Sequence, residues 1–76
     1  MQINLTIEIA GRSLDIRIDN EQEIKTAINV LRQSGKLPAG IVPDSFHSMI
    51  NQNTVSTVKT FAEENIFDGD KLTAVE

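Results

Sequence analysis

Two segments near the start of the sequence alternate strictly between apolar and polar residues, and only a short break separates them. The first, QINLTIEI over residues 2–9, places all of its isoleucine and leucine side chains on one face. The second, SLDIRID over residues 13–19, repeats this pattern after Ala10-Gly11-Arg12. A period of two that is rich in β-branched residues predicts half-buried strands. The short connection, in which Gly11 can adopt a positive φ, predicts a β-hairpin.

The apolar period changes after the hairpin to that of an amphipathic helix. The residues at helical spacing on one face are Ile24, Ala27, Ile28 and Leu31. Asn20 followed by Glu23 is an asparagine version of the capping box, and Gly35 with Pro38 marks the end. We therefore predict a helix from about Glu21 to Ser34, whose apolar face packs on the hairpin.

The middle of the chain predicts a loop followed by a third strand. Residues 36–44 contain two prolines and Gly40, which is typical of a connection. Residues 45–51 then alternate, and this places Phe46 and Ile50 on one face. His47 and Met49 fall on the opposite face, and Val55 can begin a short return strand.

The last third of the chain predicts a turn and a final strand. Residues 61–66 suit a single helical turn, Asp68-Gly69-Asp70 a tight turn, and residues 71–75 the last strand. The prediction is therefore one α+β domain over 1–76, with a mixed sheet of four to five strands and one main helix. The predicted core is Ile3, Leu5, Ile7, Leu14, Ile16, Ile18, Ile24, Ala27, Ile28, Leu31, Phe61, Ile66 and Leu72.

Size and composition argue against several classes of function. A domain of 76 residues buries only about 60% of its unfolded surface, which leaves little room for both a core and a catalytic cleft. The absence of cysteine excludes disulfides and thiolate zinc sites. Seven scattered basic residues against eleven acidic ones argue against nucleic acid and anionic membranes as partners. Because no apolar segment suits membrane insertion or a secretory signal, we expect a cytoplasmic protein.

The sequence contains no convincing catalytic or metal-binding motif. His47 is the only histidine, and no motif supplies the oriented partner and nucleophile that a catalytic base requires. Asp68 and Asp70 are too few ligands for a calcium loop and are better explained as turn residues. The glycines stand too far apart to cradle a phosphate. We therefore expect neither enzymatic activity nor a metal or cofactor.

Several segments resemble ubiquitin and its relatives. The SGKLP sequence at 34–38 is similar to the glycine stop that ends the ubiquitin helix, and FAEENI at 61–66 is similar to its short helical turn. Within this superfold, the MQINLTIEI start, LDIRI at 14–18 and IFDGDKL at 66–72 resemble the small YukD/EsaB-type ubiquitin-like proteins of bacterial type VII secretion systems. The resemblance covers nearly the whole chain and implies a ubiquitin-like β-grasp fold.

The same resemblance implies a non-enzymatic accessory or regulatory protein that binds a cytosolic domain of a secretion-machinery component. Partner proteins bind ubiquitin on the outer face of its β-sheet. The positions that match this face carry His47, Met49, Thr73 and Val75, and we expect them to form a protein-binding patch. A methionine beside a valine offers an adaptable apolar contact. Incidental exposure of apolar side chains, which is common on every protein surface, explains the same residues equally well.

The C-terminal residues separate this chain from the conjugated members of the superfold. Ubiquitin and the related sulfur carriers end in Gly-Gly, because their terminal carboxylate is adenylated in a narrow channel, whereas this sequence ends Thr73-Ala74-Val75-Glu76. We therefore expect that the protein is not conjugated. Two alternatives stay open: a small ubiquitin-like structural subunit of a multicomponent oxygenase and, with less support, a protein modifier or sulfur carrier.

Overall fold

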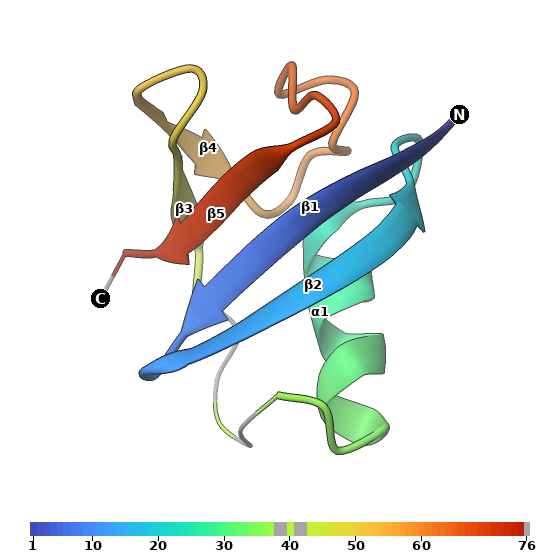
Figure 1. Cartoon of the computed structure of the whole chain (residues 1–76), viewed down its shortest axis with the longest axis vertical. Coiled ribbons are helices and arrows are strands. Elements are labelled where there is room, and N and C mark those ends of the chain that lie inside the picture. The colour runs from blue at the N-terminus through green and yellow to red at the C-terminus, as the bar shows by residue number, and fades with distance from the viewer. Residues whose placement is uncertain (38–39, 41–42, 76) are drawn as a thin grey trace.

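The computed structural model describes residues 1–37, 40 and 43–75, and over these residues it contains five strands and one helix (Figure 1). The hairpin forms as the sequence predicts: β1 (Gln2–Ile9) pairs antiparallel with β2 (Arg12–Asp19). Ala10 and Gly11 join them in a two-residue turn with φ angles of 51° and 78°. Positive φ at both positions is the turn geometry that matches the twist of paired strands.

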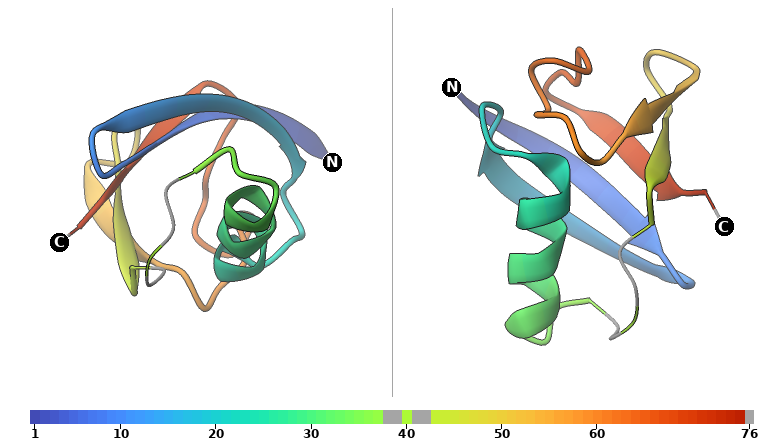
Figure 2. Two further views of the ribbon diagram at one scale, coloured as in Figure 1. Left: turned by 90° about the horizontal axis from the view of Figure 1, so that it is seen from below. Right: turned by 180° about the vertical axis from the view of Figure 1, so that it is seen from behind.

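The described strands form one mixed sheet in the order β2-β1-β5-β3-β4. Here β3 is Ser45–Ser48, β4 is Asn53–Ser56 and β5 is Asp70–Ala74. The last strand lies in the centre, parallel to β1 and antiparallel to β3. The helix α1 (Ile24–Gln33) packs across one face of the sheet (Figure 2). This arrangement confirms the predicted ubiquitin-like β-grasp fold.

The apolar core lies between the helix and the inner face of the sheet. Its buried residues are Ile3, Leu5, Ile7, Ile9, Ile24, Ala27, Ile28, Leu37, Phe46, Val55, Phe61, Ile66 and Leu72. Four residues predicted to be in the core are only half-buried, namely Leu14, Ile16, Ile18 and Leu31. The three on β2 belong to an edge strand, which has a neighbour on one side only. The sequence prediction omitted Ile9, Leu37, Phe46 and Val55.

The helix begins at Ile24, not at Glu21, and the predicted Asn20 cap is wrong. Glu23 occupies the cap position without a capping hydrogen bond from its side chain. Backbone carbonyls of the later chain satisfy the first helical N–H groups, since Ile24 donates to Lys59 at 3.0 Å and Lys25 to Thr57 at 2.8 Å. A cap supplied by residues more than thirty positions away leaves no local sequence signal.

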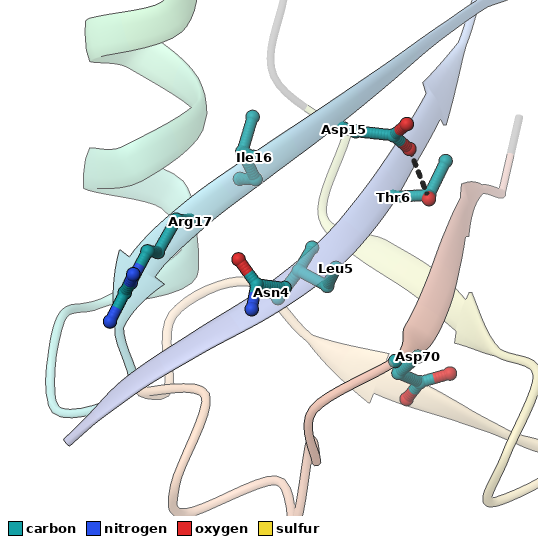
Figure 3. A pocket seen from close by; sticks show the side chains of 8 residues that line it. Asn4, Leu5, Thr6, Asp15, Ile16, Arg17 and Asp70 are labelled. Atoms are coloured by element: carbon teal, nitrogen blue, oxygen red, sulfur yellow. Dashed lines mark hydrogen bonds between the residues drawn. The ribbon is translucent and has the colours of Figure 1, made fainter.

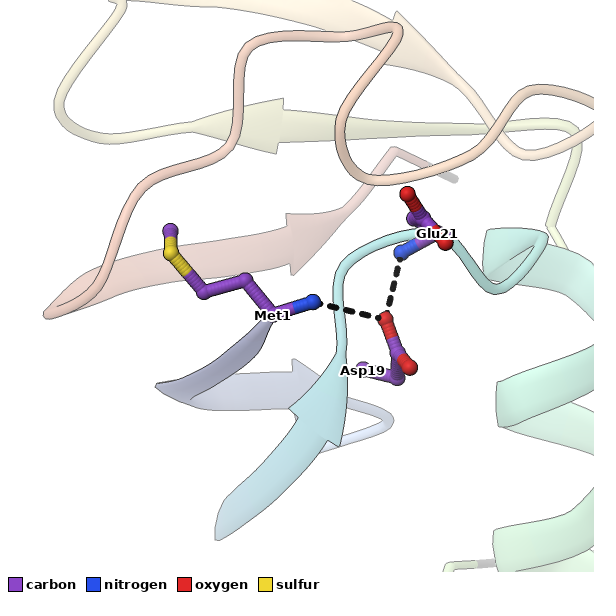
Figure 4. A network of polar contacts seen from close by, with 3 residues as sticks. All are labelled: Met1, Asp19 and Glu21. Atoms are coloured by element: carbon purple, nitrogen blue, oxygen red, sulfur yellow. Dashed lines mark hydrogen bonds and ion pairs between the residues drawn. The ribbon is translucent and has the colours of Figure 1, made fainter.

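Asp19 holds the turn that precedes the helix (Figure 4). Its Oδ1 accepts hydrogen bonds from the Glu21 N–H at 3.0 Å and from the Met1 amino group at 3.3 Å. The backbone bond from Glu21, followed by the bond from the amino group, lowers the pKa of Asp19 below its ordinary value. Residues 19–22 therefore form a hydrogen-bonded turn and do not extend the helix.

The predicted glycine stop of the helix is confirmed. Gly35 has a φ of 79° and donates to the Arg32 carbonyl at 3.0 Å, while the Lys36 N–H donates to the Leu31 carbonyl at 3.0 Å. This pair of bonds is the Schellman motif, which requires a left-handed residue at the position Gly35 occupies. Pro38, which was expected to follow the stop, lies outside the described residues.

The third strand ends at Ser48, three residues before its predicted end, because Asp70 accepts a hydrogen bond from the backbone that follows the strand. Asp70 is 1% exposed, and its carboxylate accepts hydrogen bonds from Ser48 Oγ at 2.6 Å and from the Ile50 and Lys71 N–H groups at 3.0 and 2.7 Å. Met49 and Ile50 consequently lie in a turn. Ile50 is 47% exposed and does not share the buried face of Phe46, contrary to the prediction.

The single helical turn predicted near residues 61–66 is confirmed as a hydrogen-bonded turn over residues 60–65, in which the Glu64 N–H donates to the Thr60 carbonyl at 3.2 Å. The Thr60 N–H donates to Glu63 Oε1 at 2.9 Å, and the Glu63 N–H donates to Thr60 Oγ1 at 3.0 Å. This reciprocal pair is a capping box, which the sequence analysis did not identify. Glu64 is also engaged, since its Oε2 accepts from the Ser56 N–H at 2.6 Å.

Replacing Ile28 with alanine should lower the free energy of unfolding by about 2–5 kcal/mol, because a fully buried side chain leaves a cavity behind. Chemical denaturation monitored by circular dichroism measures the change. Val30→Ala is the control on the same helix, because Val30 is 54% exposed and its truncation should have little effect. An Ile28→Ala protein as stable as the Val30→Ala protein would show that the helix faces another way.

Asp70→Asn should destabilise the fold by about 1–3 kcal/mol, because an NH2 group replaces one of the two carboxylate oxygens that now accept hydrogen bonds. Urea unfolding compares this variant with Asp44→Asn, which removes a carboxylate from an exposed position. Equal stability of the two variants would contradict the role assigned to the buried carboxylate.

Candidate functional site

The outer face of the sheet, opposite α1, carries the residues that the sequence predicts as a protein-binding patch. His47 lies on β3 directly opposite Thr73 on β5. Met49 follows the end of β3, and its N–H donates to the Lys71 carbonyl at 3.0 Å. Val75 follows the end of β5, and its N–H donates to the Ser45 carbonyl at 3.2 Å. The structure therefore brings all four residues onto two neighbouring segments, although only two of them lie within strands.

The two apolar members of the patch stand at opposite ends of it. Met49 is 54% exposed and Val75 is 46% exposed, and the pair of His47 and Thr73 lies between them. At about 3.3 Å per residue along a strand, the separation of Met49 from Val75 is roughly 13 Å. The patch is thus two apolar contacts joined by polar groups, and not one continuous apolar surface.

Exposed apolar residues that the sequence analysis did not assign to the patch gather near Met49. Ile50 donates its N–H to Asp70 Oδ1, and the Asp70 N–H donates to the Phe67 carbonyl at 3.2 Å. Ile50 is 47% exposed and Phe67 is 57% exposed. Asp70 therefore bonds the backbone of both residues close to Met49, that of Ile50 through its carboxylate and that of Phe67 through its own N–H. Only the bonding of Asp70 in the folded chain identifies this grouping.

An ion pair borders the patch on its β1 side. Lys71 Nζ lies 3.0 Å from Glu8 Oε2, and both side chains are partly exposed. The hydrogen bond from Lys71, then its positive charge and the hydrogen bond from Ser13, lower the pKa of Glu8 below its ordinary value. The lowered pKa favours the ionised form of Glu8, and the ion pair gives the patch a border of mixed charge.

A shallow hollow of about 450 Å³ lies on the hairpin side of the outer face (Figure 3). Its polar wall includes Asn4, Arg17 and Thr6, whose Oγ1 donates to Asp15 Oδ1 at 2.6 Å. Neither apolar end of the patch lines this hollow. Its chemistry therefore suits polar contacts at the border of a protein interface.

Within the described residues, no cluster of three or more histidine, aspartate or glutamate side chains is arranged to hold a metal ion. No helix in the same part of the chain has the length and apolar character needed to cross a membrane. Glu76, on which the expectation about conjugation partly rests, lies outside the described residues.

The pKa of Glu8 should rise toward its ordinary value in a Lys71→Met variant, because the main cause of its depression is removed. Since ionised Glu8 stabilises the fold above its unfolded pKa, this contribution is lost as pH falls through the lowered folded pKa. Carboxyl-detected NMR titration measures the shift. Glu63, whose lowered pKa comes first from the Thr60 backbone, is the internal control and should not move. An unchanged Glu8 titration would show that the ion pair does not persist in solution.

The fold relates this chain to solved ubiquitin-like domains. No family model and no curated protein matches the sequence. Among solved structures, the EccD5 ubiquitin-like domain from Mycobacterium xenopi matches with a TM-score of 0.56 at 16% identity, over 99% of this chain and 93% of that one. The MycP5-free ESX-5 inner membrane complex in State II matches with a TM-score of 0.57 at 13% identity. That match covers 97% of this chain and 20% of the other.

At these identities the likeness establishes the fold, a ubiquitin-like β-grasp domain. The two neighbours, an EccD5 ubiquitin-like domain and an ESX-5 inner membrane complex, agree with the resemblance seen in the sequence.

Proposed function

We propose that this chain is a non-enzymatic, YukD/EsaB-like ubiquitin-like protein that acts in the cytoplasm of a bacterium as an accessory or regulatory component of type VII secretion. The observation that carries the proposal is the match to the EccD5 ubiquitin-like domain over almost the full length of both chains. This chain therefore corresponds in extent to that domain. The sequence segments that resemble the YukD/EsaB-type proteins support the same assignment.

The partner in this proposal is a cytosolic domain of a secretion-machinery component, and it docks on the outer face of the sheet. The supporting features are the exposed side chains of Met49 and Val75 at the ends of the patch, and the exposed residues Ile50 and Phe67, whose backbones are bonded to Asp70. His47 and Thr73 supply the polar centre. The sequence has no tryptophan or tyrosine, the residues that most often anchor tight interfaces. The interface is therefore expected to be of moderate affinity.

Met49→Glu should weaken partner binding by at least about tenfold. Full burial of a methionine side chain contributes about 1.5–3 kcal/mol, and about 1.4 kcal/mol corresponds to one decade of affinity. The glutamate also adds the cost of burying a charge. The measurement is a pull-down from cells of a producing bacterium, with captured secretion components quantified by mass spectrometry and secreted substrates followed in parallel.

Val58→Glu is the matched control, since Val58 is a similarly exposed apolar residue, 63% exposed, in the segment that follows β4. Circular dichroism establishes that both variants fold. If the Met49→Glu protein folds, retains every partner and supports normal secretion, the patch is not the binding site. If the wild-type chain captures no secretion component under conditions that retain a known complex, that result contradicts the proposed role in type VII secretion.

A further inference from the structure

β2 is the longer of the two edge strands of the sheet that the described residues form. β2 has eight residues and lies at one end of the sheet, whereas β4 at the other end has four. No segment in the described part of the chain pairs with the free side of β2. An exposed edge presents backbone donors and acceptors that can pair with another strand.

The backbone bonds of Asn4 establish which groups of β2 face this free edge. The Asn4 N–H donates to Asp68 Oδ1 at 2.6 Å, and the Asn4 carbonyl accepts from the Gly69 N–H at 2.7 Å. Both groups of Asn4 therefore point toward β5 and away from β2. Its partner across the hairpin is Arg17, which must direct its own N–H and carbonyl to the free edge. Because the direction of these backbone groups alternates along a strand, the N–H and carbonyl groups of Ser13 and Asp15 also face the free edge.

The inner side of β2 is incompletely covered within one copy of the chain. Leu14, Ile16 and Ile18 all point toward the core side, yet each is only half-buried. A hollow of about 330 Å³ lies between β2 and α1, and Ile18, Val30 and Leu31 contribute to its lining. A strand added to β2 would cover this apolar surface as well as satisfying the backbone groups.

We propose that β2 pairs antiparallel with β2 of a second copy of this chain, so that two sheets join into one across a two-fold axis. The register places Ile16 opposite Ile16 of the second copy. Asp15 then lies opposite Arg17 of the second copy, and symmetry repeats this opposite-charge pair on the other side of the axis. Leu14 lies opposite Ile18 of the second copy, next to the apolar hollow beside α1.

The charges of Asp15 and Arg17 favour this register, and they favour a second copy of the chain as the pairing partner. In the described part of the chain the ion pairs are Met1–Asp19 and Lys71–Glu8, so Arg17 has no carboxylate partner within its own copy. Sliding the strands by two residues places Asp15 opposite Asp15, or Arg17 opposite Arg17, and like charges directly opposite destabilise a sheet. Sliding by one residue brings the wrong backbone groups together. An isologous pairing also closes on itself and does not continue into a fibre.

A register that pairs Arg17 with Asp19 also matches opposite charges, but it is less favourable. It shortens the overlap and leaves Leu14 uncovered. The Asp19 carbonyl already accepts from the Gln22 N–H at 3.1 Å. That register does not involve Asp15, so a substitution at Asp15 separates the two possibilities.

The test is charge exchange in the full 76-residue chain, followed by sedimentation equilibrium and light scattering. The wild-type protein should be a dimer at high concentration. Asp15→Arg and Arg17→Asp each create two like-charge pairs and should raise the dimer dissociation constant by at least about tenfold. An equimolar mixture of the two variants should recover a heterodimer, because every arginine at these two positions then faces an aspartate. The double variant Asp15→Arg/Arg17→Asp should be a dimer again.

Three outcomes overturn the proposal. One is a wild-type chain that stays monomeric at millimolar concentration, and another is a dimer that neither single variant weakens. The third is single variants that fold, as judged by circular dichroism, but do not form a heterodimer on mixing.

Amide hydrogen exchange gives an independent readout of the dimer, because the N–H groups of Asp15 and Arg17 should become protected as the protein concentration rises. Val75→Glu, on the outer-face patch, should leave the dimer unchanged and so separates this inference from the proposed partner site.

Discussion

The carboxylate of Asp70 is buried at the point where three segments of the chain meet. It accepts hydrogen bonds from the last residue of β3, from the turn after β3 and from the backbone at the start of β5. The desolvation of a charged group is compensated only when such donors are fixed in place. The residue therefore determines where β3 ends and where β5 begins. Its hydrogen bonds also connect the backbones of Ile50 and Phe67 to the start of β5.

The central position of β5 has consequences for the rest of the sheet. Because β5 lies between β1 and β3, the N-terminal hairpin is attached to the other strands through β1 alone. β2 is consequently an edge strand of the described sheet, and its three inward side chains pack against the buried core without a neighbouring strand on their second side. The half-burial of Leu14, Ile16 and Ile18 follows from topology and not from their sequence, which alternates as regularly as that of β1.

Local pattern was sufficient to predict the elements whose determinants are local. The period of two identified the hairpin, and Gly35 identified the end of the helix, because a Schellman motif needs a left-handed residue there. The helix start could not be predicted in this way, since carbonyls of Thr57 and Lys59 provide its cap. The role of Asp70 was also hidden, because an aspartate next to glycine is a normal turn residue until its burial is known. For the patch, alternation placed His47 and Thr73 on the outer face, but it did not show how far apart Met49 and Val75 lie.

The two proposed surfaces are compatible with one another because they lie at different places on the sheet. The patch lies on β3 and β5, and β1 separates those strands from the free edge of β2. A dimer formed through β2 would therefore display two copies of the patch, related by the two-fold axis. A partner that is itself present in more than one copy would bind both patches, and the second contact would then form at high effective concentration. Such avidity would compensate for the absence of tryptophan and tyrosine anchors in the patch, since each contact alone is expected to be of moderate affinity.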